Sequence, residues 1–265
     1  MAGAPLALHE SGLWTLEARL PDRPCRLFFD TGAGLTCLTP ELCRSLGLAP
    51  LGRATGFRMS GERVDMPLHE GPALTLADTA LELETVACLD IAALLPGTFS
   101  PVDGVLALDA LASRPFTITT EPALQIETAD SLAERRRVGA LLDVRLARPA
   151  AGLALDVFLR VKAPPGPDAS ALWLELDTGK TGPTLIGAHR RPELGLSDAG
   201  TAGRETAPAA RSLELDLGAE VVRVDAQFRE LIYDGVIGAE LFADRPITFD
   251  LARAEVWLGP RQERP

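Results

Sequence analysis

The apolar residues of this 265-residue chain come in short runs separated by glycine, proline and other turn residues. Short runs bounded in this way are typical of β-strands, whereas an amphipathic helix repeats apolar residues three and four positions apart over a longer stretch. The pattern therefore predicts an all-β protein. Expected strands lie at 13–20, 25–29, 74–76, 81–87, 105–108, 116–119 and 124–126 in the first half, and at 153–161, 172–176, 213–217, 221–228, 236–237, 247–249 and 255–258 in the second.

Three other segments carry local signals. Pro40 and Gly47 frame a short helix at 41–46, because proline favours the first turn of a helix and glycine its end. Ser60-Gly61 predicts the tip of a hairpin at 57–64. Residues 129–138 are polar and helix-prone. We expect them to connect a first lobe at 1–128 with a second lobe at 139–265.

Both halves contain the same motifs in the same order. The tripeptide Asp-Thr-Gly ends an apolar run at residues 30–32 and again at 177–179, an offset of 147. Asp-Gly followed by apolar residues stands at 103–106 and at 234–237, an offset of 131. Two copies at so long a period indicate a duplicated unit, since a solenoid needs about three or more shorter repeats.

These motifs resemble those of aspartic proteases. Phe28–Ala33 resembles the active-site signature of the retropepsin-like branch, and Asp103–Leu108 resembles the strand and short helix that close each half of such enzymes. The order of motifs covers nearly the whole chain, once per half. The resemblance implies a bacterial, single-chain fusion of two retropepsin-like units, with an all-β, two-lobed pepsin/retropepsin-like barrel fold and a cleft between the lobes.

The resemblance assigns Asp30 and Asp177 as a catalytic dyad. Two carboxylates about 3 Å apart cannot both ionise, so they hold one proton between them. One then acts as a general base on water, and the other as a general acid on the carbonyl of a peptide. The implied function is that of an aspartic endopeptidase.

The residues after each aspartate are implied to shape the active-site loops. In the family, the hydroxyls of Thr31 and Thr178 each bond across to the other loop. Gly32 and Gly179 let the backbone turn tightly and bring its N–H groups to the carboxylates.

The fourth positions differ between the two loops. Ala33 lacks the hydroxyl that pepsins place there to favour ionisation, so the dyad is expected to keep its proton to higher pH and to work nearer neutrality. Lys180 fits neither branch of the family. Its ammonium either lies near the dyad and silences it, or extends to solvent on its long stem. The first alternative would make the chain a catalytically silent peptide-binding pseudoprotease.

Met59, Ser60 and Gly61 form a candidate flap that would bind substrate, although an ordinary surface hairpin fits the same residues. The equivalent region of the second lobe, 198–210, is short and rich in alanine, glycine and threonine. The chain has one tyrosine, Tyr233, and it lies outside this hairpin. Glu175, inside the second apolar run, could face either solvent or the site.

Composition restricts the partners. A net charge of −11 argues against nucleic acids and anionic membranes, because no basic stripe could neutralise phosphates. We expect a peptide or protein substrate, no cofactor, no metal and a monomer. No apolar run reaches the length of a membrane helix, and residues 1–10 lack the features of a signal peptide. A cytoplasmic location is therefore expected, or a periplasmic or secreted one if a leader has been removed.

The cysteines and histidines show no spacing that indicates a site. The four cysteines are expected to be small buried apolar residues rather than members of a disulfide or a metal site, and the three histidines to be structural or exposed. These residues are Cys25, Cys37, Cys43 and Cys88, with His9, His69 and His189.

Overall fold

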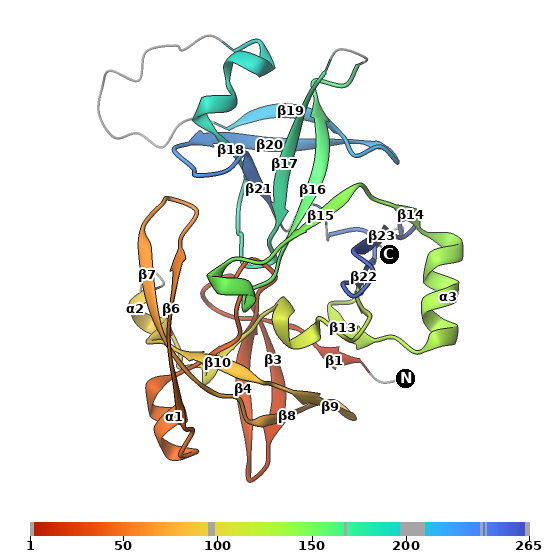
Figure 1. Cartoon of the computed structure of the whole chain (residues 1–265). Helices are drawn as coiled ribbons and strands as arrows, with labels where there is room; N and C mark the ends of the chain where they lie inside the picture. Colours follow the sequence, from red (N-terminus) through yellow and green to blue (C-terminus); the bar gives the residue numbers. More distant parts are fainter. Residues whose placement is uncertain are drawn as a thin grey trace.

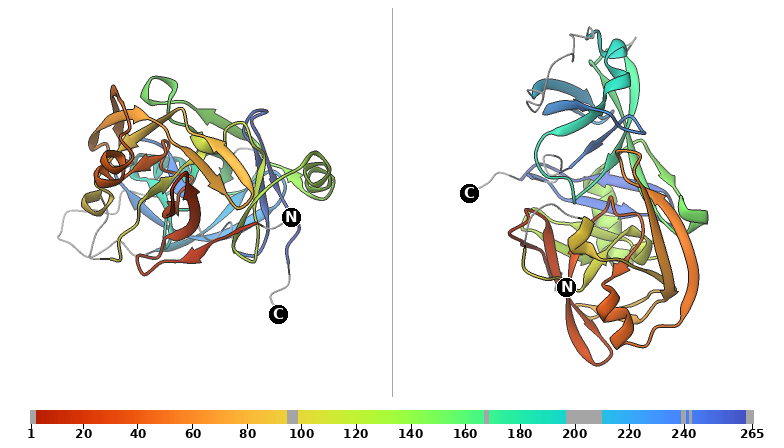
Figure 2. Two further views of the ribbon diagram at one scale, coloured as in Figure 1. Left: turned by 90° about the horizontal axis from the view of Figure 1, so that it is seen from below. Right: turned by 90° about the vertical axis from the view of Figure 1, so that its left-hand side faces the viewer.

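The computed structural model describes residues 3–94, 99–166, 169–196, 210–238, 241 and 243–262. These residues form mostly β-strands, arranged as two lobes with a third sheet beside the junction between them (Figures 1 and 2). The all-β, two-lobed expectation is confirmed. Within the described residues, no helix has the length and apolar character needed to cross a membrane.

The first lobe is built on a ten-stranded sheet in the order β6-β7-β10-β5-β11-β4-β3-β8-β9, with β2 paired to β3. The apolar runs seen in the sequence lie on the faces of this sheet that pack into the core, and their side chains are almost fully buried. The strands are β2 (Ala7–Leu8), β3 (Trp14–Leu20), β4 (Arg23–Phe29), β5 (Cys37–Leu38), β6 (Pro50–Phe57), β7 (Arg63–Glu70), β8 (Ala73–Leu76), β9 (Thr79–Glu82), β10 (Thr85–Cys88) and β11 (Gly104–Leu106).

The second lobe is built on a seven-stranded sheet in the order β15-β16-β17-β21-β18-β20-β19. An additional pairing of Lys162 in β16 with Asp216 in β19 closes this sheet into a barrel. Strand β20 shows the expected alternation of buried and exposed residues along its whole length. The strands are β15 (Val144–Ala147), β16 (Asp156–Ala163), β17 (Ser170–Leu176), β18 (Thr184–Gly187), β19 (Arg211–Asp216), β20 (Val221–Arg229) and β21 (Gly235–Ile237).

A six-stranded sheet takes strands from both halves, in the order β1-β13-β12-β22-β23-β14. At its centre the Oγ1 atoms of Thr117 and Thr248 lie 2.8 Å apart, and the rings of Phe116 and Phe249 stack at 4.8 Å. Thr117 and Thr248 keep the 131-residue offset of the duplicated motifs, so equivalent strands of the two copies pair here. The strands are β1 (Ala4–Pro5), β12 (Phe116–Ile118), β13 (Ala123–Ile126), β14 (Ala140–Leu141), β22 (Ile247–Asp250) and β23 (Glu255–Leu258).

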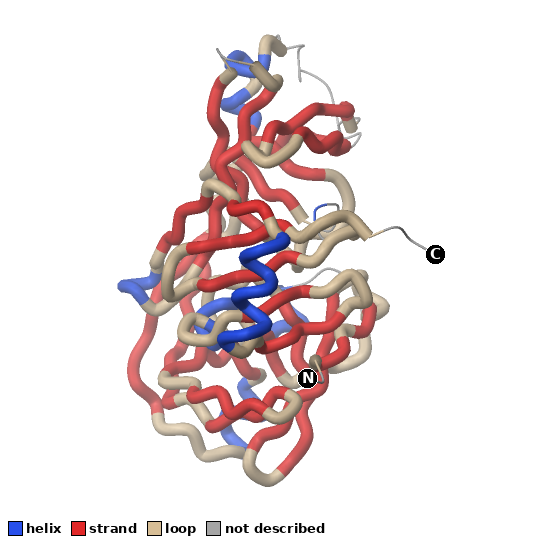
Figure 3. The backbone as a smooth tube through the Cα atoms, turned by 90° about the vertical axis from the view of Figure 1, so that its right-hand side faces the viewer, coloured by secondary structure: helices blue, strands red, loops and turns tan. Residues whose placement is uncertain are grey.

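Helices are short and have clear local causes. The expected helix at 41–46 is confirmed as α1 (Pro40–Ser45), whose first turn is capped by the Thr39 hydroxyl. The helix α3 (Ala129–Val138) starts with a capping box of Thr128 and Ser131 and lies against the shared sheet (Figure 3). The division of the chain at this connector stays a prediction. The remaining helical segments are α2 (Ile91–Leu94) and the 3₁₀ turns η1 (Leu108–Leu111), η2 (Ala150–Gly152), η3 (Ala188–Arg190) and η4 (Pro192–Leu194).

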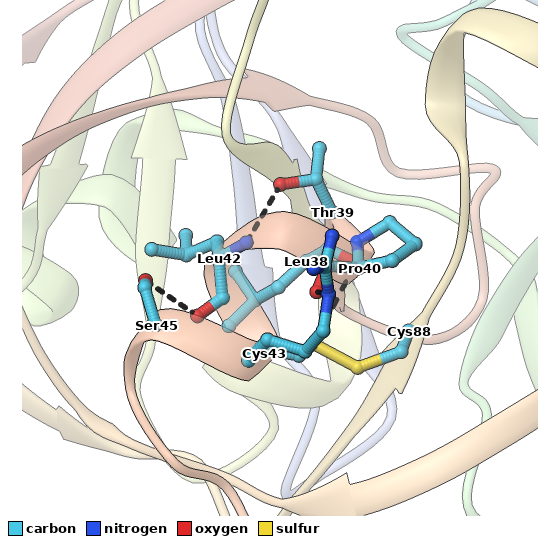
Figure 4. Close-up of a disulfide and its surroundings, with 8 residues drawn as sticks. Leu38, Thr39, Pro40, Leu42, Cys43, Ser45 and Cys88 are labelled. Atoms are coloured by element: carbon cyan, nitrogen blue, oxygen red, sulfur yellow. Dashed lines mark hydrogen bonds between the residues drawn. A yellow bond between two sulfur atoms is a disulfide. The ribbon is translucent and has the colours of Figure 1, made fainter.

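The expectation of four free cysteines is wrong for one pair. Cys43 in α1 and Cys88 at the end of β10 form a disulfide, with their Cα atoms 6.6 Å apart (Figure 4). The two residues meet because β10 pairs with β5, the strand just before α1. That pairing is tertiary, so sequence spacing could not reveal it. Cys25 and Cys37 are free and buried, as expected.

Candidate active site

Both Asp-Thr-Gly loops begin where a buried central strand ends. Strand β4 leads to Asp30 and β17 leads to Asp177. Strand β4 lies parallel to β11, which carries the first Asp-Gly motif, and β17 lies parallel to β21, which carries the second. The backbone N–H of Asp30 donates to the carbonyl of Leu106 at 3.1 Å, and that of Asp177 to the carbonyl of Ile237 at 3.0 Å. The two distant motifs of each half therefore fix the start of its loop.

The aspartates of the Asp-Gly motifs hold these central strands in register. The Asp103 carboxylate accepts the backbone N–H of Arg26 at 2.9 Å, and the Asp234 carboxylate accepts that of Trp173 at 2.8 Å. Arg26 and Trp173 stand four residues before Asp30 and Asp177, respectively. The duplication seen in the sequence thus extends to individual hydrogen bonds.

Reciprocal hydrogen bonds lock the two loops together. The Thr31 hydroxyl donates to the carbonyl of Leu176 at 2.7 Å and accepts the Thr178 N–H at 2.9 Å. The Thr178 hydroxyl donates to the carbonyl of Phe29 at 3.2 Å and accepts the Thr31 N–H at 3.0 Å. Both threonines are buried, so all four bonds are shielded from water. The lobes are joined at the point where their aspartates emerge.

The two carboxyl groups lie against each other's loops. The Gly32 N–H donates to Asp30 at 2.8 Å, and the Gly179 N–H donates to Asp177 at 2.7 Å. A Cβ atom on Gly32 would lie 2.4 Å from Cγ of Asp177, and one on Gly179 would lie 2.5 Å from Oδ2 of Asp30. Only glycine leaves room for the opposite carboxyl group at each place.

Burial raises the pKa of both aspartates, and the two carboxyls share a hydrogen bond. The pKa of Asp177 rises further, because the charges of Asp30 and then Glu175 oppose its ionisation. Asp177 is 6% exposed, whereas Asp30 is half-buried and so stays accessible to water. Both pKa values are therefore raised, and the two carboxyls titrate as one coupled pair.

Behind the first loop, Thr36 and Asp109 form a support that the sequence reasoning missed. The Asp109 carboxylate accepts the backbone N–H of Thr36 at 2.8 Å and its hydroxyl at 2.6 Å. The same hydroxyl accepts the N–H of Ala107 at 3.1 Å. Burial raises the pKa of Asp109 to about 6. Asp109 follows the first Asp-Gly motif by a few residues, which is the one sequence signal that could have indicated it.

Glu175, Tyr233 and Asp156 add further polar groups beside the dyad. Glu175 is 5% exposed and accepts the Tyr233 hydroxyl at 2.5 Å, so its side chain is buried rather than turned to solvent. Burial raises the pKa of Glu175 to about 8. Burial, and then the charge of Asp30, raise the pKa of Asp156 to about 6. Sequence reasoning left Glu175 open and missed the other two, because strand pairing and loop packing bring them in.

The fourth residues of the loops lie differently. Ala33 is exposed, and its carbonyl accepts the N–H of Leu35 at 2.8 Å. Lys180 is half-buried, and its ammonium donates to the carbonyl of the adjacent Thr181.

The candidate flap reaches the second lobe. Strands β6 and β7 form the expected hairpin, with Met59, Ser60 and Gly61 at its tip and Gly61 at φ +84°. The Met59 carbonyl accepts the N–H of Ile232 at 3.1 Å, and Figure 1 shows the hairpin rising from the first lobe toward the second. The equivalent region of the second lobe lies outside the described residues, apart from Ala210.

Comparisons with known proteins agree with this geometry. The aspartyl protease family matches residues 16–110. Two 7S globulins share the fold at 11% identity over 97% of this chain and 94% of theirs. They are the basic 7S globulin from soybean (TM-score 0.61) and conglutin gamma from lupine seeds (TM-score 0.60). An aspartic proteinase from Irpex lacteus shares it at 14% identity and a TM-score of 0.58, over 98% of this chain and 97% of its own. No curated protein sequence matches the chain.

The chain therefore has the two-lobed fold of pepsin-like aspartic proteases, and the aspartyl protease sequence pattern is present over residues 16–110 of its first lobe. The similar structures include both a named proteinase and named globulins. The fold by itself does not decide between cleavage and binding.

Proposed function

We propose that the chain is an aspartic endopeptidase that cleaves peptide bonds with a water molecule activated by Asp30 and Asp177. The observation that carries the proposal is the reciprocal threonine bonding, which holds two carboxyls with raised pKa values against each other. A dyad that keeps one proton supplies a base and an acid at the same site.

In the proposed reaction, ionised Asp30 takes a proton from water while the water oxygen bonds to the peptide carbonyl carbon. Protonated Asp177 gives its proton to the carbonyl oxygen, which yields a tetrahedral gem-diol. Asp30 then gives its proton to the amide nitrogen, the C–N bond breaks, and Asp177 recovers a proton from a gem-diol hydroxyl. The dyad ends each turnover in its starting state.

The proposed substrate is an extended peptide bound between the flap and the dyad. The strand β6 is the outer strand of its sheet, so it has unpaired backbone groups with which an added strand could pair. Met59, Ser60 and Gly61 then cover the peptide from the first lobe. Because one chain supplies both aspartates, the proposed active form is a monomer.

A second candidate is a peptide-binding protein without activity. Lys180 is the reason to consider it, because an ammonium next to the dyad would stabilise the doubly ionised pair and remove the acid. The hydrogen bond of the Lys180 ammonium to the Thr181 carbonyl favours the enzyme instead, since it directs the charge to the loop backbone.

The test is cleavage of a diverse peptide library from about pH 3 to about pH 8, the range over which a carboxylate dyad titrates. Wild type is compared with Asp30→Asn, Asp177→Asn and the matched control Asp78→Asn, which changes an exposed aspartate. Each variant is first shown to be folded by circular dichroism. We expect the control to cleave like wild type and both dyad variants to be inactive.

Cleavage by either dyad variant at the wild-type rate would disprove the assignment. Binding of library peptides by wild type without cleavage at any pH would establish the second candidate.

A further inference from the structure

A cluster of two cysteines and one histidine lies at the base of the flap hairpin, away from the dyad. One possible ligand atom from each of Cys43, Cys88 and His69 lies within 4.8 Å of the others. These residues come from three elements, α1, β10 and β7. Sequence spacing gave no sign of the cluster.

Strand register explains how the three residues meet. His69 in β7 pairs with Val86 in β10, and Cys88 stands two residues further along the same strand. Residues two apart on a strand share a face, so His69 and Cys88 are diagonal neighbours on one face of the sheet. The helix α1 follows directly from β5, the other neighbour of β10, and brings Cys43 onto Cys88.

The histidine has an unused ligand atom. Nδ1 of His69 is buried and has no hydrogen-bond partner within the described part of the chain. A buried polar atom without a partner is costly, and a metal ion satisfies a ring nitrogen as well as a hydrogen bond does. Cys43 and Cys88 are 3% and 7% exposed, so the sulfur atoms are shielded while His69 is half-buried.

The spacing suits zinc. Bonds of about 2.3 Å to sulfur and about 2.0 Å to nitrogen place the ligand atoms of a tetrahedral site about 3.4–3.8 Å apart. The two sulfur atoms are bonded in the disulfide and must separate after reduction, while the imidazole nitrogen already lies within 4.8 Å of both. Three protein ligands leave the fourth position to water.

We propose that Cys43, Cys88 and His69 form a redox-gated site for a thiophilic divalent cation, with zinc as the reference ion. In the oxidised chain the disulfide occupies both sulfur atoms, and no metal binds. In the reduced chain the two thiolates and the imidazole hold the ion. Either state joins α1 to β10, beside the strand that continues into the flap.

The chemistry balances in two steps. A dithiol reductant supplies two electrons and two protons, so the S–S bond breaks, two thiols form, and the reductant becomes a disulfide. The metal ion then displaces the two thiol protons to solvent as two metal–sulfur bonds form. Binding therefore requires prior reduction and strengthens as pH rises.

The experiment compares oxidised and reduced full-length protein. Dithiothreitol reduces the chain, desalting under nitrogen removes the reductant, and Zn²⁺ is added and removed by a second desalting before elemental analysis. The same set is repeated with Co²⁺, whose thiolate charge-transfer absorption reports sulfur ligation directly. The variants are Cys43→Ser, Cys88→Ser and His69→Gln, with Cys37→Ser as the matched control because Cys37 is a free buried cysteine outside the cluster.

We expect about one zinc per reduced wild-type chain and at least about tenfold less in the oxidised chain. Cys37→Ser should retain the metal, both cluster serine variants should lose it, and His69→Gln should bind at least about tenfold more weakly. In case a variant misfolds, alkylation is mapped by mass spectrometry on reduced wild type. Zinc should protect Cys43 and Cys88 but leave the modification of Cys25 and Cys37 unchanged. Reduced wild type that binds no more zinc than oxidised wild type, or equal protection of all four cysteines, would overturn the proposal.

Discussion

Replacing Glu175 with glutamine tests whether this buried carboxyl is neutral beside the dyad. Glu175 is 5% exposed on β17, two residues before Asp177, and accepts the Tyr233 hydroxyl. Glutamine has the same shape and keeps an oxygen for that hydroxyl, but it cannot ionise. The substitution therefore removes one titration and leaves the packing in place.

The size of the expected change in stability follows from the raised pKa of Glu175. Burial raises the pKa of Glu175 from 4.5 to about 8. Between these values the folded chain holds a proton that the unfolded chain has released, so stability falls as pH rises. The stability that protonated Glu175 contributes to the folded chain is fully present below pH 4.5 and is lost as pH rises through about 8. A gap of about 3.5 units at about 1.36 kcal/mol per unit sets an upper limit of about 5 kcal/mol.

The assay is urea unfolding of wild type and Glu175→Gln at about pH 5 and about pH 8, with linear extrapolation of the free energy of unfolding. We expect wild type to lose about 3–4 kcal/mol more than the variant between the two pH values. The pKa values of Asp109 and Asp156 are also raised, and these groups titrate in the same direction, but both proteins contain them. The exposed Glu82→Gln serves as the control and should behave like wild type.

If the free energy of unfolding falls equally with pH in wild type and in Glu175→Gln, within about 0.5 kcal/mol, the raised pKa of Glu175 is refuted. It would mean that Glu175 is ionised in the folded chain. The same variant has a kinetic consequence. Above about pH 8, where Glu175 ionises, its charge raises the pKa of Asp177, so glutamine should move the part of the basic limb that lies above that pH to lower pH.

Three further predictions concern the loops. Thr31→Val leaves the Leu176 carbonyl and the Thr178 N–H unpaired, and should lower the free energy of unfolding in urea by about 2–4 kcal/mol. The control Thr55→Val, at an exposed position, should lower it by under about 1 kcal/mol, and equal losses in the two variants would contradict the interlocking role of Thr31. Gly32→Ala places a Cβ atom 2.4 Å from Cγ of Asp177, and should lower the rate of peptide cleavage about 100-fold or more while the circular dichroism spectrum stays that of the wild type. Near-normal cleavage would show that the two loops can move apart. Lys180→Met should leave the pH profile of cleavage within about twofold of wild type, because the ammonium is bound to a loop carbonyl; a gain of several-fold would instead identify Lys180 as a silencing residue.

Several features could be predicted from the sequence because their causes are local or repeated. The helix α1 was expected from Pro40 and Gly47, and the hairpin tip from Ser60-Gly61. The duplicated motifs indicated two lobes and a pair of loops, because each apolar run must end at a turn and two equivalent copies have equivalent places in the fold.

Other features depend on residues that meet only in three dimensions. The strand β15 and the late start of β16 at Asp156 were not expected, because their ends depend on partners in the barrel. The burial of Glu175 depends on Tyr233 from a distant loop, and the Cys43–Cys88 disulfide depends on the pairing of β10 with β5. Local pattern fixes what a segment can form, whereas burial and long-range pairing set the pKa of a carboxyl and the partner of a thiol. The sequence thus determined the two lobes and their paired Asp-Thr-Gly loops, and the tertiary structure decided the protonation and redox chemistry around them.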